Sequence, residues 1–180
     1  MTLPLIDPVL TLLLCCAGAL VFLHGAFAKW REREIFAAAL QNYELIPEVT
    51  VPTASTALIL AETVVGLMLL VPAASPLGQV AGIGLLLLVT AAIAINLLRG
   101  RTEISCGCGG NDQQISWGLV ARNLGFAALL GVAALPHVAR EWLWLDYAMA
   151  AFGGFTLAGL YAVASQLLGN HPRLVALRDA

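Results

Sequence analysis

The hydrophobic pattern divides the chain into five long apolar segments separated by short polar connections. The segments cover about residues 9–28, 54–71, 77–98, 117–135 and 142–168. An α-helix needs roughly 20 predominantly apolar residues to cross the hydrocarbon core of a bilayer, and these segments are close to or above that length. They are too long and too uniformly apolar for the alternating strands of a membrane barrel. The pattern therefore predicts an all-α membrane protein with a bundle of four to five transmembrane helices.

Residues 35–52, between the first and second spans, are not apolar enough to cross a membrane. Their apolar residues instead recur at loosely helical spacing, which is typical of a helix lying in the membrane interface. We expect this amphipathic interfacial helix to stop near Pro47. The stripe consists of Ile35, Phe36, Ala39, Leu40, Tyr43 and Leu45.

The composition supports a single integral membrane domain covering residues 1–180. Of the residues, 60% are hydrophobic and 11% are charged, and the mean hydropathy is +0.88. A soluble domain carries about 25% charged residues. The net charge is −2 and the nine Lys and Arg are scattered, so no electrostatic case exists for nucleic-acid binding. No Lys or Arg precedes Val9, so we expect the first apolar segment to be a retained helix rather than a cleaved signal peptide.

Several ionisable groups should share one end of the bundle. Because consecutive spans alternate in direction, the loops after the first and third spans lie on the same side of the membrane. Glu62 and Arg122 enter the second and fourth spans from that side. We expect this end to hold His24, Lys29, Glu62, Arg122, Cys106 and Cys108.

Each of these ionisable side chains has a structural interpretation beside a functional one. Glu62 is costly inside a membrane and should face the bundle interior, either as a functional carboxylate, as a neutral hydrogen-bonded acid or in an ion pair with Lys29 or Arg122. His24 is either a helix–helix hydrogen-bonding residue or a proton-transferring group. Arg122 either extends toward the interface or stabilises a thiolate.

The loop 104–112 carries the most recognisable chemistry. Cys106 and Cys108 flank Gly107, and cysteines at this spacing can come within disulfide range. Such a small ring favours a disulfide that exchanges with a partner, and Gly107 permits the unusual backbone that it needs. The alternatives are a structural disulfide, an unpaired dithiol, and half of a metal site, although two thiolates alone do not complete tetrahedral zinc coordination. Cys15 and Cys16 lie deep in the first span and are expected to pack as ordinary core residues.

The order of several short motifs resembles a known family. The chain reads Gly25-Ala26-Phe27-Ala28-Lys29-Trp30, then Asn42-Tyr43-Glu44-Leu45-Ile46-Pro47, then Ala61-Glu62-Thr63-Val64-Val65-Gly66. It continues with Cys106-Gly107-Cys108-Gly109-Gly110, Ser116-Trp117 and Arg122-Asn123. Together these segments resemble the methylamine-utilisation membrane protein family MauE, within the wider DoxX-like group, over most of the chain up to about residue 135.

The resemblance implies a bacterial inner-membrane, multi-pass helper protein. Such a protein would support maturation of the periplasmic, disulfide-rich small (β) subunit of methylamine dehydrogenase. The implied activity is thiol–disulfide oxidoreductase-like exchange at Cys106 and Cys108. The implied partners are a thioredoxin-like periplasmic protein of the MauD type and the client subunit. The architecture also resembles quinone-coupled membrane proteins of the vitamin K epoxide reductase type, which makes a membrane quinone a candidate cofactor. Those proteins use Cys-x-x-Cys, whereas this chain has Cys-Gly-Cys. A non-enzymatic assembly subunit and a small transporter are the alternative functions.

The distribution of basic residues bears on which side the Cys-Gly-Cys loop faces. Only Arg140 belongs to the opposite end, whereas the end that carries the loop is rich in Lys and Arg. The positive-inside rule therefore favours a cytoplasmic loop, while the family resemblance implies a periplasmic one. The basic residues at the loop end are Lys29, Arg31, Arg33, Arg99, Arg101, Arg173 and Arg178.

Overall fold

A computed structural model describes residues 6–107, 114–136, 138 and 141–178, with side chains described up to residue 167. Within these residues the chain forms α-helices joined by short connections, which confirms the predicted all-α class. The elements are α1 (Pro8–Arg31), α2 (Arg33–Asn42), the 3-10 helix η1 (Glu48–Thr50), α3 (Val51–Leu70), α4 (Ser75–Leu98), α5 (Trp117–Ala133) and α6 (Trp144–Arg178).

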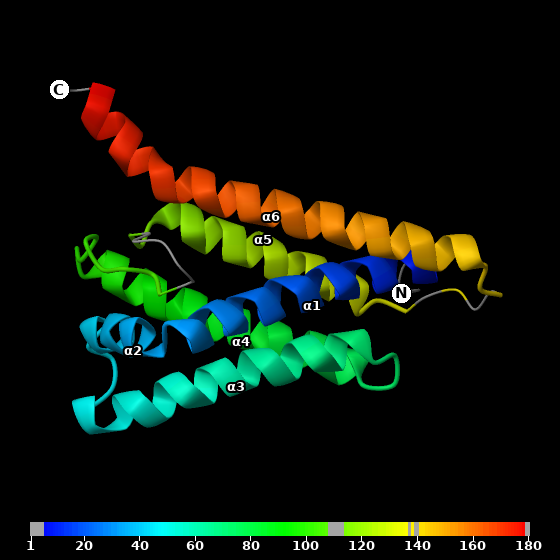
Figure 1. Cartoon of the computed structure of the whole chain (residues 1–180), viewed down its shortest axis with the longest axis horizontal. Helices are drawn as coiled ribbons and strands as arrows, with labels where there is room; N and C mark the ends of the chain where they lie inside the picture. Colours follow the sequence, from blue (N-terminus) through cyan, green and yellow to red (C-terminus); the bar gives the residue numbers. More distant parts are fainter. Residues whose placement is uncertain (1–5, 108–113, 137, 139–140, 179–180) are drawn as a thin grey trace, which may run out of the picture.

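The helix α1 is the centre of the bundle. It packs against α3, α5 and α6, while α4 packs against α3 and α5 (Figure 1). The long helices alternate in direction, so α2, the α4–α5 connection and the C-terminal end of α6 lie at one end of the molecule (Figure 1). We call this the α2 end. The loops after the first and third apolar segments therefore share a side, as the sequence predicts.

The helices have the lengths and surfaces of a membrane bundle. Among the described residues, four stretches are long and apolar enough to cross a membrane, namely Pro8–Arg31, Glu48–Leu70, Ser75–Leu98 and Trp144–Leu167. The helix α5 is a shorter apolar helix of 17 residues. Large apolar side chains on α6 point outward, including Phe152 at 75% exposure. Lipid is the solvent that makes such a surface stable, and the chain is a multi-pass membrane protein.

Local chemistry accounts for where several helices begin and end. The Asp7 carboxylate caps α1 by accepting from the Val9 N–H, and Pro8 occupies the first turn, where its missing donor costs nothing. The amide groups of Ala74 and Ser75 both donate to the carbonyl of Val71, which closes the tight turn between α3 and α4.

Two helix ends differ from the sequence prediction. The amphipathic helix α2 ends at Asn42 rather than near Pro47, because Glu44 adopts a positive φ of 50° and its N–H donates to Gln41. The last apolar segment, predicted to end at about residue 168, continues as part of α6, which is helical to Arg178. Each residue added to an existing helix gains one hydrogen bond when its backbone dihedrals are fixed. The helix can therefore continue beyond its apolar residues.

Small residues bring the helices close together. A Cβ at Gly66 of α3 would meet Leu23 of α1 at 2.7 Å, and a Cβ at Gly153 of α6 would meet Leu13 of α1 at 2.3 Å. Small residues serve this purpose in membrane bundles, where packing rather than water exclusion drives association. The resulting core combines side chains from α1, α3, α4 and α5, among them Leu14, Phe22, Val65, Leu69, Leu86, Phe126 and Leu130.

Candidate functional site

Cys106 sits in a short loop that is anchored at the α2 end of the bundle. Ser105 and Gln114 form an isolated antiparallel bridge, and the Ile115 N–H donates to the Ile104 carbonyl at 3.0 Å. Cys106 is only 7% exposed and packs in an apolar cluster with Tyr43, Ile93, Ile104, Ile115, Leu119 and Val120. The base of the loop is therefore held by this backbone bridge and by the burial of its first cysteine.

The sulfur of Cys106 is disulfide-bonded, whereas Cys15 and Cys16 are free thiols. Cys108 lies outside the described residues, so its predicted pairing with Cys106 enters below as part of a proposal. Cys15 is buried in the core, where its sulfur contacts Ser75 Oγ at 3.3 Å and Gln79 Nε2 at 3.2 Å. The Cβ of Cys16 lies against Gly154 of α6. The prediction that these two cysteines have ordinary packing roles agrees with their surroundings.

Gly107 is constrained in two independent ways. Its φ is +65°, in the left-handed region that L side chains rarely adopt. A Cβ at this position would also meet the Phe36 ring at 3.0 Å and the Ala39 side chain at 3.3 Å. The glycine between the two cysteines therefore lets the loop turn and lets it approach α2.

We expect Gly107→Ala to loosen the contact between the loop and α2. Gly100→Ala is the matched control, because Gly100 also has a positive φ, +76°, but has open space around its Cβ position. The left-handed backbone costs roughly 1–2 kcal/mol in both variants, and the clash with Phe36 adds about 1–3 kcal/mol only at Gly107. Hydrogen–deuterium exchange should therefore rise in α2 for Gly107→Ala alone. Equal exchange in the two variants would mean that the loop does not rest on α2.

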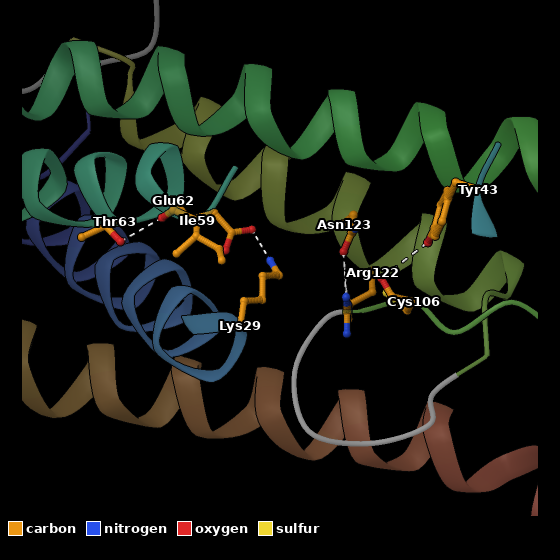
Figure 2. Close-up of polar contacts among 8 residues, drawn as sticks. All are labelled: Lys29, Tyr43, Ile59, Glu62, Thr63, Cys106, Arg122 and Asn123. Atoms are coloured by element: carbon orange, nitrogen blue, oxygen red, sulfur yellow. Dashed lines mark hydrogen bonds and ion pairs between the residues drawn. The ribbon is translucent and has the colours of Figure 1, made fainter. Parts of the chain in front are cut away.

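Tyr43 is a site residue that sequence reasoning placed on the interfacial stripe without linking it to the cysteines. It follows α2, is 5% exposed, and its hydroxyl donates a long hydrogen bond of 3.5 Å to the Cys106 carbonyl (Figure 2). Burial raises the pKa of Tyr43 to about 12. The hydroxyl therefore stays protonated at physiological pH and remains a donor. Only the tertiary structure could reveal this contact, because the two residues are 63 positions apart.

The Lys29–Glu62 ion pair joins α1 to α3 close to the α2 end (Figure 2). Both side chains are 10% exposed, and Lys29 Nζ also lies 5.3 Å from the centre of the Phe36 ring. Glu62 Oε2 is buried without a hydrogen-bond partner among the described residues. It lies 3.7 Å from the position that a Cβ would take at Gly25. Of the alternatives weighed from the sequence, Glu62 thus faces the bundle interior and pairs with Lys29.

Arg122 does not join this pair. Its guanidinium donates to Asn123 Oδ1 at 3.0 and 3.2 Å and to Ser165 Oγ at 2.7 Å, and it lies 4.8 Å from the centre of the Tyr161 ring. Arg122 therefore faces α6, and its described contacts do not include Cys106. The sequence predicted the end of the bundle at which Arg122 lies. It did not predict the residues that Arg122 contacts.

His24 also lies apart from the other predicted site residues. It is exposed on α1, whereas its neighbours Phe22 and Ala26 are buried. Successive helix residues are rotated by about 100°, so a residue two positions from each of two inward-facing residues points outward. His24 therefore does not share the bundle interior with Glu62, and a functional role for His24 stays a prediction.

The described residues offer no metal site. No group of three or more His, Cys, Asp or Glu side chains lies close enough to hold a metal ion within the parts of the chain that the structure describes. The α2 end thus holds a buried, disulfide-bonded Cys106, whose carbonyl accepts from Tyr43 and whose neighbour Gly107 lies against α2.

Comparisons with known proteins give a consistent result. The family model described as methylamine utilisation protein MauE matches residues 7–136. A methylamine utilization protein MauE of Paracoccus versutus is 36% identical over 89% of this chain and 89% of its own length. The proteins of that name from Paracoccus denitrificans and Methylorubrum extorquens are each 37% identical, over 92% and 87% of this chain and 90% and 83% of their own lengths. No solved structure matches significantly.

Proposed function

Because the chain belongs to the MauE family of methylamine utilisation proteins, we propose that it supports methylamine utilisation by thiol–disulfide exchange at Cys106 and Cys108. The client would be the small subunit of methylamine dehydrogenase or a similar disulfide-rich periplasmic protein. A thioredoxin-like protein would carry the exchange between the two. The observation that carries the proposal is the disulfide-bonded Cys106 in an anchored loop at one end of the bundle.

The proposed exchange follows the chemistry of any dithiol–disulfide couple. A partner thiolate attacks one sulfur of the Cys106–Cys108 disulfide, and the other sulfur leaves as a thiolate, which gives a mixed disulfide. A second partner thiolate then resolves the mixed disulfide. The partner leaves oxidised, and the chain is left as a dithiol that has gained two electrons.

The burial of Cys106 makes the two cysteines unequal. Attack requires the incoming thiolate to reach a sulfur along the axis of the disulfide, and Cys106 is packed against an apolar cluster. We therefore assign Cys108 as the sulfur that forms the mixed disulfide and Cys106 as the leaving thiolate. Tyr43 and Gly107 act as positioning residues that keep Cys106 in place.

Return of the dithiol to the disulfide requires a two-electron acceptor. A membrane quinone and the disulfide of a second protein are the two classes that we consider. The described neighbours of Cys106 are apolar, and the cleft at Arg122 does not include Cys106 in its lining, so we derive no step through a quinone.

The alternative functions differ from exchange in what they require of the structure. A transporter that moves its solute past Glu62 and His24 needs both residues on one path, yet His24 is on the outer surface of α1. A purely structural assembly subunit needs a disulfide that stays closed. The redox behaviour of Cys106 separates this last alternative from the proposal.

Differential alkylation tests the proposal. Membranes carrying the full chain with Cys15→Ser and Cys16→Ser would be treated with a maleimide of large mass before and after mild reduction. We expect no mass shift before reduction and a shift for two thiols afterwards. Incubation with the oxidised thioredoxin-like partner, after reduction and before alkylation, should abolish that shift. A disulfide that resists mild reduction would favour the assembly alternative instead.

The same variant tests the orientation that the proposal needs. After reduction, a membrane-impermeant maleimide should label intact spheroplasts if the α2 end faces the periplasm. Labelling only after the membranes are broken would place the loop in the cytoplasm, as the basic residues at that end favour, and would overturn the periplasmic client.

A further inference from the structure

A cleft of about 270 Å³ lies between α1, α5 and α6, and it takes no part in the proposed exchange. It reaches the outer surface of the bundle, because Leu129 and Leu160 line it and are 42% and 59% exposed. Within the bilayer, such a cleft opens sideways into lipid. Its volume is slightly below the range of roughly 300–1,000 Å³ that is usual for small-molecule sites, which suits one flexible chain.

The walls of the cleft are apolar except at one end. They are formed mainly by leucines of the three helices, together with Phe126 and Gly125. A Cβ built at Gly125 would have no heavy atom within 4 Å, so the cleft is open next to this glycine. Nothing in this part of the lining distinguishes one hydrocarbon from another.

Arg122 supplies the polar end of the cleft. No carboxylate pairs with its guanidinium among the residues that the structure describes, and its described acceptors, Asn123 and Ser165, are both neutral. A guanidinium within a membrane helix is costly unless it has a partner. An anion in the cleft would offset that cost. It would also accept stronger hydrogen bonds from the Arg122 N–H groups than the neutral Asn123 and Ser165 do.

The polar and apolar parts of the cleft are ordered along the membrane normal. Arg122 lies in the second turn of α5, near the α2 end, and it is joined there by Tyr161 and Ala164 of α6. Leu130 and Leu157 line the deeper part. The lining from Arg122 to Leu130 spans eight residues of α5, about 12 Å at 1.5 Å per residue. A lipid in the adjacent leaflet has the same order, with its headgroup outside and its chain inside.

We infer that this cleft binds a single-chain amphiphile with an oxyanion headgroup, with Arg122 as the partner of the anion. The carboxylate of a fatty acid and the phosphate of a single-chain lysophospholipid share this chemistry. The inference rests on the charge of Arg122 and the apolar lining, and it is independent of the chemistry at Cys106.

Binding of a fluorescent fatty acid tests the inference. The full chain in a neutral maltoside detergent would be titrated with cis-parinaric acid, whose emission rises in an apolar site. We expect saturable binding that oleate displaces, and at least tenfold weaker displacement by oleyl alcohol, which has the same chain without the charge. Lysophosphatidylglycerol displacing better than oleate would identify a phospholipid as the source of the headgroup.

Two variants and one matched control locate the binding to this cleft. Gly125→Leu fills the cleft without altering Arg122, and Arg122→Gln removes only the charge, so each should weaken binding about tenfold or more. Gly131→Leu adds the same side chain at a position of the same helix that has open space and lies outside the cleft lining, so it should bind as the unaltered chain does. Unchanged binding by Gly125→Leu, or displacement by oleyl alcohol or decylubiquinone as effective as that by oleate, overturns the inference.

Discussion

Serine at position 106 is expected to trap a mixed disulfide between Cys108 and the thioredoxin-like partner. The Cys106→Ser chain has no disulfide of its own, so its Cys108 thiolate attacks the disulfide of the oxidised partner and releases one partner thiolate. The resulting mixed disulfide persists because the chain lacks the second thiol that would resolve it. Non-reducing gels of membranes from cells that express the client should therefore show a higher-mass band for Cys106→Ser that reductant removes. For Cys108→Ser the band should be weak or absent, because the remaining Cys106 is 7% exposed and poorly accessible to a partner.

Both serine variants should leave the client short of disulfides, because neither can reform a disulfide of its own. Cys15→Ser and Cys16→Ser are the matched controls, since both thiols are free and lie within α1. We expect these controls to support normal client maturation. Full maturation in the Cys106→Ser/Cys108→Ser double variant would reject the redox proposal, and an assembly role would then be the better explanation.

Lys29→Met is expected to cause the largest loss of stability of any single change at the α2 end. The substitution leaves the Glu62 carboxylate buried without a cation, and breaking a buried ion pair on one side costs about 3–5 kcal/mol. The Lys29→Met/Glu62→Met double variant should recover most of that loss, because apolar replacement of both partners is often neutral. Thermal unfolding in detergent, monitored by the loss of monodisperse protein, measures both effects.

The exposed ion pair between Arg101 and Glu44 provides the control for the comparison of the Lys29 and Glu62 variants. Its side chains are 33% and 67% exposed, and such a pair contributes roughly 0–1 kcal/mol. Arg101→Met should therefore change the unfolding temperature only slightly. A loss as large as that of Lys29→Met would mean that basic residues at this end stabilise the chain in general, and not through the buried pair.

Client maturation in the same variants shows whether Glu62 has more than a structural role. Glu62→Gln keeps the shape of the side chain and removes its charge. If the carboxylate acts in the exchange pathway, disulfide formation in the client should fall further than the amount of the chain in the membrane. An equal fall in both, or normal maturation by the stable double variant, would assign the pair to the fold alone.

The sequence predicted the helices because their signals are local. Long apolar runs can satisfy their backbone hydrogen bonds in lipid only as helices, and short polar connections separated one predicted run from the next. Of the predicted interfacial stripe, Phe36, Ala39 and Tyr43 are buried at i, i+3, i+7 spacing. Ile35 and Leu45 of the same stripe are exposed, so the sequence predicted this buried face only in part. Alternating helix direction then brought Lys29, Glu62 and the Cys106 loop to the same end.

The rotation of each helix about its axis was decided only by the tertiary structure. An apolar helix in lipid has no polar face to orient it, so the pattern could not tell that His24 points outward or that Arg122 faces Ser165 on α6. Close contacts at small residues set that rotation, such as Gly66 against Leu23 and Gly153 against Leu13. Thus the sequence alone determined the class of the fold and the end of the bundle that carries the chemistry. The packing of one apolar helix on another determined that Lys29 pairs with Glu62, that Tyr43 meets Cys106 and that a cleft opens below Arg122, because these contacts join residues far apart in the chain.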